Sequence, residues 1–307
     1  MTETENERDV VIVGGGPAGL SAAVWCRDLG LSALLIEKKE NLGGQLPSIH
    51  NPIENYLGVK ADNGALLLDQ FMANARDLPF RVCCELLGAD LSERSLVSTE
   101  GTEFRSRAII IATGVRRRSL GVPGENKFYG RGVLRSGVGE KLSINRKKVL
   151  IVGGGDAAIE NALSLSEIAD RVIVVHRGGN FSARHDFIAA LGMKKNVEVL
   201  FKQVLRSIDG DDAVRSVTIE DTSSGESSVI PVDAVLVRIG VIPNSEPFQD
   251  QIATDDAGYI KVGTCGETVM RGIYAIGDVA NPIAPTISTA VGTAAMAVKH
   301  IAHLLKG

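Results

Sequence analysis

The sequence predicts an α/β fold, because the same strand–loop–helix pattern occurs in it twice. Residues 10–23 read VVIVGGGPAGLSAA and residues 149–162 read VLIVGGGDAAIENA, with identical residues at eight of the fourteen positions. Each copy is a continuous apolar run, typical of a buried parallel strand, followed by a glycine loop and a helix-like segment. Further apolar runs at residues 108–111, 234–239 and 273–276 also lead into glycine-containing loops, which indicates more strands of the same kind.

The glycine spacing of both copies is that of a dinucleotide-binding loop. In the first copy Gly14 permits a tight turn, Gly16 lets the backbone approach a pyrophosphate, and Gly19 lets the helix pack closely on the strand. Each loop opens a helix whose N-terminal N–H groups face the phosphates. We therefore predict two Rossmann-like dinucleotide-binding domains. The second copy has the same spacing, at Gly153, Gly155 and Ala158.

The residue that ends the second strand differs between the two copies. In the first copy Glu37 stands 23 residues after Gly14. In the second copy His176 stands 23 residues after Gly153 and is followed by Arg177. A carboxylate accepts hydrogen bonds from ribose hydroxyls, whereas a His-Arg pair suits the 2′-phosphate of NADP. The sequence thus predicts FAD in the first copy and a nicotinamide nucleotide in the second, with a solvated loop arginine as the alternative interpretation of Arg177.

Composition and charge argue against several function classes. The 307-residue chain has a formal net charge of -4 and no run of like charge longer than the three arginines at residues 116–118, so nucleic-acid binding is not expected. The uncharged stretch at residues 10–26 is too short and too rich in glycine to span a membrane. The acidic Glu3, Glu5 and Glu7 precede it, where a signal peptide would be basic, and we expect a cytoplasmic protein.

The four cysteines form no C-x-x-C pair, so neither a zinc site nor a thioredoxin-type redox pair is expected. Cys26 lies on the helix after the first glycine loop and is expected in the core. Cys83 and Cys84 fall in a strand-like run at residues 80–87, where neighbours point to opposite faces, and this disfavours a disulfide between them. Cys265 is interpreted as a structural thiol.

Seven short segments carry a resemblance to a known family. They are Gly14-Gly15-Gly16-Pro17-Ala18-Gly19, Gly43-Gly44-Gln45-Leu46, Glu54-Asn55-Tyr56, Ala112-Thr113-Gly114, Gly130-Arg131-Gly132-Val133, Gly153-Gly154-Gly155-Asp156 and Gly277-Asp278-Val279. Their order resembles that of the low-molecular-weight thioredoxin reductases over essentially the whole chain from Val10. The resemblance implies a homodimer whose subunits have an FAD domain, residues 1–117 and 244–307, and an inserted NAD(P)-type domain, residues 118–243.

The glycine loops and the resemblance together define candidate site residues. The resemblance implies that Gln45 and Asn55 lie beside the isoalloxazine ring. Asp278 stands at a predicted strand end, where its carboxylate is placed to bond the flavin ribitol or the pyrophosphate side. No metal site is expected. The candidate FAD-binding residues are Gly14, Gly16, Pro17, Ala18, Gly19, Glu37, Gly44, Gln45, Asn55, Val82, Thr113, Gly114, Asp278, Thr286 and Ile287. The candidate NAD(P)-binding residues are Gly153, Gly155, Asp156, Ala157, Ala158, His176, Arg177 and Arg184.

One departure from the family pattern concerns the redox centre. The family's C-x-x-C follows the Gly-Arg-Gly-Val segment, and counting forward places Ser136 and Gly139 at its two positions. A disulfide relay needs one attacking and one resolving thiol, so the chain is not expected to be a true thioredoxin reductase. Glu140 matches the carboxylate that follows the pair in the family, and is interpreted either as a proton-transfer residue or as a surface glutamate.

Two further departures concern the nucleotides. Gly178 and Ser182 occupy places where the family carries arginine, with Arg184 near enough to compensate, so a preference for NADPH does not follow from the resemblance. The Pro285-Thr286 pair replaces an Arg-Gln pair near the flavin, so the surroundings of the flavin are expected to differ.

Three functions are compatible with these observations. The leading hypothesis is an FAD-dependent oxidoreductase that passes electrons from NAD(P)H through FAD to a small-molecule or protein acceptor, without a disulfide relay. The first alternative is a nicotinamide-independent flavoenzyme, ferredoxin-linked or oxidising dithiols, whose second nucleotide site is vacant or holds another nucleotide such as a second flavin. The second alternative is a non-catalytic FAD-binding redox sensor.

Overall fold

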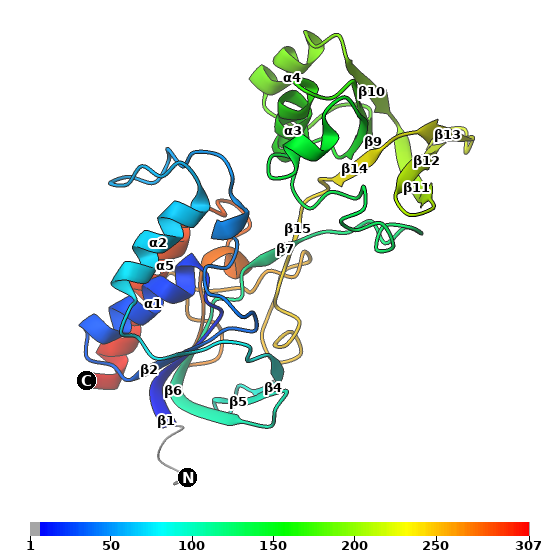
Figure 1. Ribbon diagram of the computed structural model, residues 1–307. Helices are drawn as coiled ribbons and strands as arrows, with labels where there is room; N and C mark the ends of the chain where they lie inside the picture. Colours follow the sequence, from blue (N-terminus) through cyan, green and yellow to red (C-terminus); the bar gives the residue numbers. More distant parts are fainter. Residues whose placement is uncertain (1–6, 307) are drawn as a thin grey trace. The chain divides into compact units, whose positions relative to one another are not determined.

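The computed structural model describes residues 7–306, which form two compact units (Figure 1). Unit 1 contains the chain up to Arg116 and again from Ile242, and unit 2 is the insertion Arg117–Val241. The connecting strands β7 (Val115–Arg117) and β15 (Val241–Pro243) are paired with each other. Which nucleotide each unit binds remains a prediction.

The sheet of unit 1 has seven strands, in the order β3-β2-β1-β6-β5-β4, with β16 also paired to β6. Strand β1 runs parallel to both β2 and β6, and β6 runs parallel to β16, so the centre of the sheet is parallel. The continuous apolar runs seen in the sequence form this centre, because strands covered on both faces bury every side chain. The strands are β1 (Glu7–Val13), β2 (Ala33–Ile36), β3 (Phe80–Arg81), β4 (Leu86–Asp90), β5 (Ser95–Ser98), β6 (Glu103–Ile111) and β16 (Ile273–Ala275).

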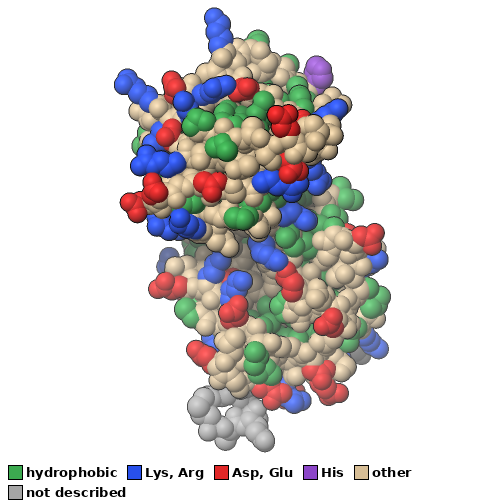
Figure 2. All heavy atoms as spheres, turned by 90° about the vertical axis from the view of Figure 1, so that its right-hand side faces the viewer, with side chains coloured by type: hydrophobic (Ala, Val, Ile, Leu, Met, Phe, Trp, Pro, Cys, Tyr) green, Lys and Arg blue, Asp and Glu red, His purple; other side chains and the backbone are tan. Residues whose placement is uncertain are grey.

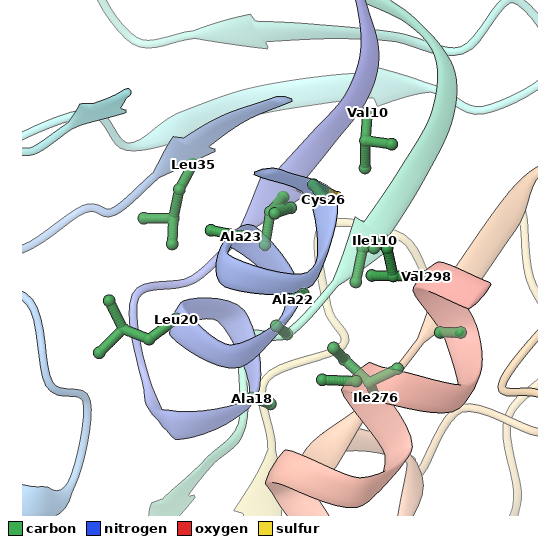
Figure 3. Packing of buried hydrophobic residues seen from close by; sticks show 14 of the residues in the cluster. Val10, Ala18, Leu20, Ala22, Ala23, Cys26, Leu35, Ile110, Ile276 and Val298 are labelled. Carbon is green, nitrogen blue, oxygen red and sulfur yellow. The ribbon is translucent and has the colours of Figure 1, made fainter. Parts of the chain in front are cut away.

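Among the described residues of unit 1 there are three α-helices: α1 (Pro17–Asp28), α2 (Gly64–Asn74) and α5 (Ile287–Lys306). Pro17 begins α1, where its missing N–H costs nothing, and the Asn63 side chain caps α2 by accepting from Leu66 N at 3.0 Å. Helices α1 and α5 pack against each other and the sheet, and Figure 3 shows Cys26 of α1, Ile110 of β6 and Val298 of α5 in this layer. Cys26 is fully buried, which confirms its expected place in the core.

Unit 2 repeats the plan with a parallel sheet of order β10-β9-β8-β14. Strands β9 and β14 lie on opposite sides of β8, so the order of the strands reverses between β8 and β14. In sheets of this kind, ligands bind at the carboxyl ends of the strands, beside the point of reversal. The sheet strands are β8 (Lys148–Val152), β9 (Arg171–His176), β10 (Val197–Phe201) and β14 (Ala234–Val237). The helices are α3 (Asp156–Ser166) and α4 (His185–Gly192), and a separate antiparallel sheet is formed by β11 (Gln203–Gly210), β12 (Val214–Asp221) and β13 (Ser227–Pro231).

These two units confirm the predicted α/β fold class, with two local corrections. The predicted strand-like run at residues 80–87 is wrong: β3 ends at Arg81, and Cys83 adopts a left-handed φ of 51°. The chain turns there because Cys83 N and Cys84 N donate to carbonyls of the loop after β2, at 3.0 and 2.9 Å. Strand β14 is also shorter than the run predicted at residues 234–239, since it ends at Val237.

Charged side chains of both signs alternate on the face of the molecule seen in Figure 2, as the small net charge leads one to expect. Among residues 7–306, every helix is either too short or too polar for crossing a bilayer. In the same part of the chain no three His, Cys, Asp or Glu side chains are grouped so that they could hold a metal ion.

Replacing Ile110 by alanine tests whether the layer between helices and sheet holds unit 1 together. Ile110 is fully buried on β6, so Ile110→Ala leaves a cavity and is expected to cost about 2–5 kcal/mol of unfolding free energy. Leu87→Ala serves as the control, because Leu87 is 72% exposed, and its effect should stay within about 0.5 kcal/mol. Denaturant unfolding of both variants measures this, and equal losses would contradict the assignment of the core.

Candidate functional site

The glycine loop of unit 1 is a place where side chains do not fit. Gly14 has a φ of +108°, and a Cβ built on it would lie 2.5 Å from the carbonyl oxygen of Ala112. A Cβ on Gly19 would lie 1.9 Å from the carbonyl oxygen of Gly14. Gly44, with a φ of +58°, faces Gly16 across the loop, its own Cβ position 2.8 Å from the Gly16 Cα. The loop is therefore a tightly packed backbone cradle in which these positions have no room for a side chain.

Glu37 fixes this cradle from the end of β2. Its side chain is buried, with Oε2 accepting from Gly15 N at 2.8 Å and Oε1 accepting from Lys39 N at 2.9 Å. Each carboxylate oxygen has a second lone pair, so Glu37 can hold the loop and still accept from a ribose hydroxyl. The predicted ribose contact thus has a second, structural role that the sequence pattern did not reveal.

A cavity of about 390 Å³ opens beside Gly14, Glu37 and Thr113. Arg116 and Asn244 also line it, and the sequence analysis did not include them among the site residues. Thr113 Oγ1 donates to Asn244 O at 2.7 Å and Asn244 Nδ2 donates to Thr113 O at 2.8 Å, so two segments distant in sequence close this wall. The only sequence signal was the glycine turn before Asn244. The volume is in the range of small-ligand sites.

Asp278 provides a carboxylate next to Gln45, the residue that follows Gly44. It lies in the 3-10 helix Gly277–Ala280 directly after β16, and Gln45 Nε2 donates to its Oδ2 at 3.5 Å. Burial raises the pKa of the Asp278 carboxyl. Asn55 is exposed and, within residues 7–306, forms no hydrogen bond to either residue. The structure therefore joins Gln45 to Asp278 by a hydrogen bond that does not include Asn55.

The remaining candidate residues of unit 1 belong to several different elements. Thr286 Oγ1 accepts from Thr289 N at 3.2 Å, so its hydroxyl caps the start of α5. Ile287 packs on the small apolar cluster around Leu46 and Leu67. Val82 is half-buried against the main core cluster. The other residues predicted for FAD, which form the start of α1 and the end of the Thr113 turn, are Pro17, Ala18 and Gly114.

The second glycine loop is built in the same way in unit 2. Gly153 has a φ of +148°, and its Cβ position lies 2.1 Å from the carbonyl oxygen of Arg238. Ala158 is fully buried at the place where the first copy has glycine. His176 lies directly under the loop, its Nδ1 2.4 Å from the Cβ position of Gly154, and its ring is beside Phe181 with centroids 5.8 Å apart. His176 therefore supports the loop as a packed ring.

The two arginines predicted to hold a nucleotide phosphate have different surroundings. Arg177 is exposed and forms no hydrogen bond or ion pair within residues 7–306. Arg184 is engaged: its N–H donates to Asp156 Oδ1 at 2.7 Å, its Nε lies 3.4 Å from Asp156 Oδ2, and its guanidinium covers the Phe187 ring at 3.9 Å. Asp156 and Ala157 form the exposed first turn of α3. Of the two predicted arginines, Arg177 is therefore the one whose side chain has no protein partner within residues 7–306.

The turn at Ser136–Glu140 is held by polar contacts. Ser136 Oγ accepts from Gly139 N at 3.1 Å, and Glu140 Oε2 accepts from Arg135 N at 2.6 Å and from Ser136 N at 2.8 Å. The Glu140 carboxylate thus closes the turn. Neither interpretation of Glu140 from the sequence included this role, because the role depends on the position of the Arg135 backbone N–H, five residues before Glu140.

Comparison with known proteins finds relatives that match nearly the whole chain. A family model described as pyridine nucleotide-disulphide oxidoreductase matches residues 8–299. Thioredoxin reductase of Bacillus subtilis (strain 168) is 33% identical over 303 residues, covering 97% of this chain and 95% of that protein. A 34.2 kDa protein in the rubredoxin operon of Clostridium pasteurianum is 31% identical over 304 residues, covering 97% and 98%.

Solved structures of thioredoxin reductases are similar to this chain over nearly its whole length. Thioredoxin reductase of Lactococcus lactis matches with a TM-score of 0.84 and 29% identity, covering 97% of this chain and 99% of that one. The expected similarity to thioredoxin reductases and the prediction of an oxidoreductase are confirmed by these relatives. The chain belongs to the pyridine nucleotide-disulphide oxidoreductase family.

Proposed function

We propose that this protein is an FAD-dependent oxidoreductase that passes electrons from NAD(P)H through FAD to a small-molecule or redox-protein acceptor without a disulfide relay. One contrast supports the proposal above all. Two glycine loops of the same construction are followed by opposite charges, the buried Glu37 in unit 1 and the unpaired Arg177 in unit 2. A carboxylate suits ribose hydroxyls and repels a 2′-phosphate, whereas an arginine attracts it.

The residues of unit 1 fit FAD. The backbone cradle of Gly14, Gly16 and Gly44 suits a pyrophosphate, and the free lone pairs of Glu37 suit the adenosine ribose. The adjoining cavity of about 390 Å³ offers space for the adenosine half, and Gln45 with Asp278 offers polar groups for the flavin half. Bound FAD would supply the hydride and electron transfer, while these residues bind and orient it.

The residues of unit 2 fit a nicotinamide dinucleotide. The exposed first turn of α3 presents N–H groups for a pyrophosphate, and Arg177 at the end of β9 is available to a 2′-phosphate. Arg184 is less suited to the compensating role predicted for it, because Asp156 holds both its backbone and its side chain.

The cysteines support electron transfer without a thiol step. Ser136 and Gly139 form a hydrogen-bonded turn at the positions counted for the redox pair. All four cysteines are free, and burial raises the pKa of Cys26 to about 12 and also raises that of Cys84. A thiol is a nucleophile only as thiolate, so neither of these two is suited to attack a disulfide at neutral pH. The homodimer and the cytoplasmic location expected from the sequence stay predictions.

One observation favours a second candidate, the nicotinamide-independent flavoenzyme. Because Arg184 is paired with Asp156, Arg177 is the one of the two predicted arginines that has no side-chain partner within residues 7–306. A site with one free arginine and an acidic first turn also suits a nucleotide without a 2′-phosphate, such as a second flavin.

Anaerobic mixing with NADPH, and separately with NADH, distinguishes the two candidates. We expect either nucleotide to bleach the visible absorption of the oxidised flavin rapidly. If neither does so in protein that dithionite still reduces, the nicotinamide route is wrong, and reduced ferredoxin and dithiols become the donors to test.

Arg177→Gln tests the proposed 2′-phosphate contact. Losing a charged hydrogen bond of about 1.5–3 kcal/mol should weaken NADPH binding about tenfold or more and leave NADH binding unchanged. Arg171→Gln is the matched control, since Arg171 begins the same strand and is paired with Glu198. Dissociation constants from flavin-independent binding measurements decide it, and an equal loss for NADPH and NADH would assign Arg177 another role.

Glu37→Gln tests the proposed FAD site. An amide accepts through one oxygen only, so either Gly15 N or Lys39 N would face an NH₂ group, and the cradle would lose its support. We expect FAD to dissociate at least about tenfold more readily, because a charged hydrogen bond is lost. Flavin retention on gel filtration measures the effect. The exposed neighbour Glu40 provides the control Glu40→Gln, which should retain flavin like the wild type.

A further inference from the structure

The loop after β9 lies against the residue that follows β10. His176 and Phe201, the last residues of these two parallel strands, are in register, so both strands end at the same edge of the sheet. The residue after Phe201 is Lys202, and Lys202 N donates to Gly178 O at 3.1 Å. Lys202 is therefore a direct neighbour of the loop that begins with Arg177.

The side chain of Lys202 lies beside this loop. A Cβ built on Gly179 would lie 4.0 Å from the Cε atom of Lys202, which is the carbon that carries the ammonium group. Gly178 occupies a place where the family pattern has arginine, and a Cβ there would lie only 2.9 Å from Nε2 of His176. Lys202 thus brings a positive charge from the neighbouring strand to a loop that has glycine in place of arginine.

Hydrogen bonds on both sides fix the backbone of Lys202. Its N–H donates to Gly178, and its carbonyl oxygen accepts from Thr222 N at 2.7 Å and from Thr222 Oγ1 at 3.0 Å. Lys202 has a φ of 55°, in the left-handed region that residues other than glycine seldom adopt. Because these bonds hold the backbone, the Lys202 side chain leaves the end of β10 at a fixed point beside the loop.

The ammonium group of Lys202 is accessible to a ligand. Lys202 is exposed, and within residues 7–306 its ammonium forms no hydrogen bond or ion pair. Asp221, whose pKa is lowered by backbone N–H groups and to a smaller extent by the charge of Lys202, already accepts from Gln203 Nε2 at 2.8 Å. Arg177 is also exposed. Two adjacent strands therefore each present one exposed cation at the same edge of the sheet.

We propose that Lys202 binds the 2′-phosphate of NADP(H) together with Arg177, and that Lys202 is thereby a specificity-determining residue of unit 2. A phosphate monoester carries about -1.5 to -2 charges at pH 7 and has three acceptor oxygens, so one arginine neutralises it only in part. Arginine forms paired hydrogen bonds to two of the oxygens, and lysine adds a compact point charge. The inference rests on the proposed use of a nicotinamide nucleotide and names a residue that would select NADP over NAD.

Calorimetric titration of the full-length protein with bound FAD, using NADP⁺ and separately NAD⁺, tests the site without any redox step. We expect the wild type to bind NADP⁺ more tightly than NAD⁺. Lys202→Gln should weaken NADP⁺ binding about tenfold, as for a lost charged hydrogen bond, and leave NAD⁺ binding unchanged. Lys202→Arg should keep the preference, because it keeps the charge. The control Lys195→Gln removes the same charge from an exposed lysine before the start of β10, and should change either affinity less than about twofold.

Three results would overturn the role of Lys202. They are a wild type that binds NADP⁺ no more tightly than NAD⁺, a Lys202→Gln variant that binds NADP⁺ as the wild type does, and an equal loss in Lys195→Gln. A loss in Lys202→Gln that is equal for both nucleotides would also contradict it, since Lys202 would then only support the loop. Oxidised nucleotides cannot reduce the flavin, so the two proposals fail separately. If NADPH does not bleach the flavin while Lys202→Gln selectively weakens NADP⁺ binding, the electron donor is wrong and the phosphate site stands.

Discussion

The close approach of backbone to backbone at the first glycine loop is the constraint on which unit 1 depends. Gly19 meets the carbonyl of Gly14, and Gly14 meets that of Ala112, at separations that admit no Cβ. The loop thereby ties α1 to the ends of β1 and β6 at the carboxyl edge of the sheet. Glu37 then secures it with its carboxylate. Because these positions are glycine, the loop backbone carries no side chains there, and in dinucleotide-binding loops this lets a phosphate approach the backbone.

The same strand–glycine loop–helix arrangement occurs in both units, with different residues around the loop. The second loop keeps the same clash-free geometry around Gly153, while an aromatic-packed His176 supports it where Glu37 supports the first. The fold is thus conserved between the units, and their expected functions differ through the few residues at strand ends.

Sequence reasoning succeeded where local pattern determines structure. The apolar runs and glycine spacing predicted β2, the start of α1 and the α/β class, because burial and backbone sterics act within a few residues. It failed at Cys83, where hydrogen bonds to the loop after β2 override strand propensity. It also missed the pairing of Arg184 with Asp156 and the wall formed by Asn244, because these contacts join residues 28 and 131 positions apart.

The central claim is that electrons leave the flavin without a thiol relay. An anaerobic reductive titration of the purified protein with dithionite tests it most directly, by counting the electrons taken up per bound FAD. We predict uptake of a single electron pair per FAD, because Ser136 and Gly139 offer no disulfide and the four cysteines are free. Uptake of a second pair per FAD would reveal a redox-active disulfide elsewhere in the chain and would contradict the account.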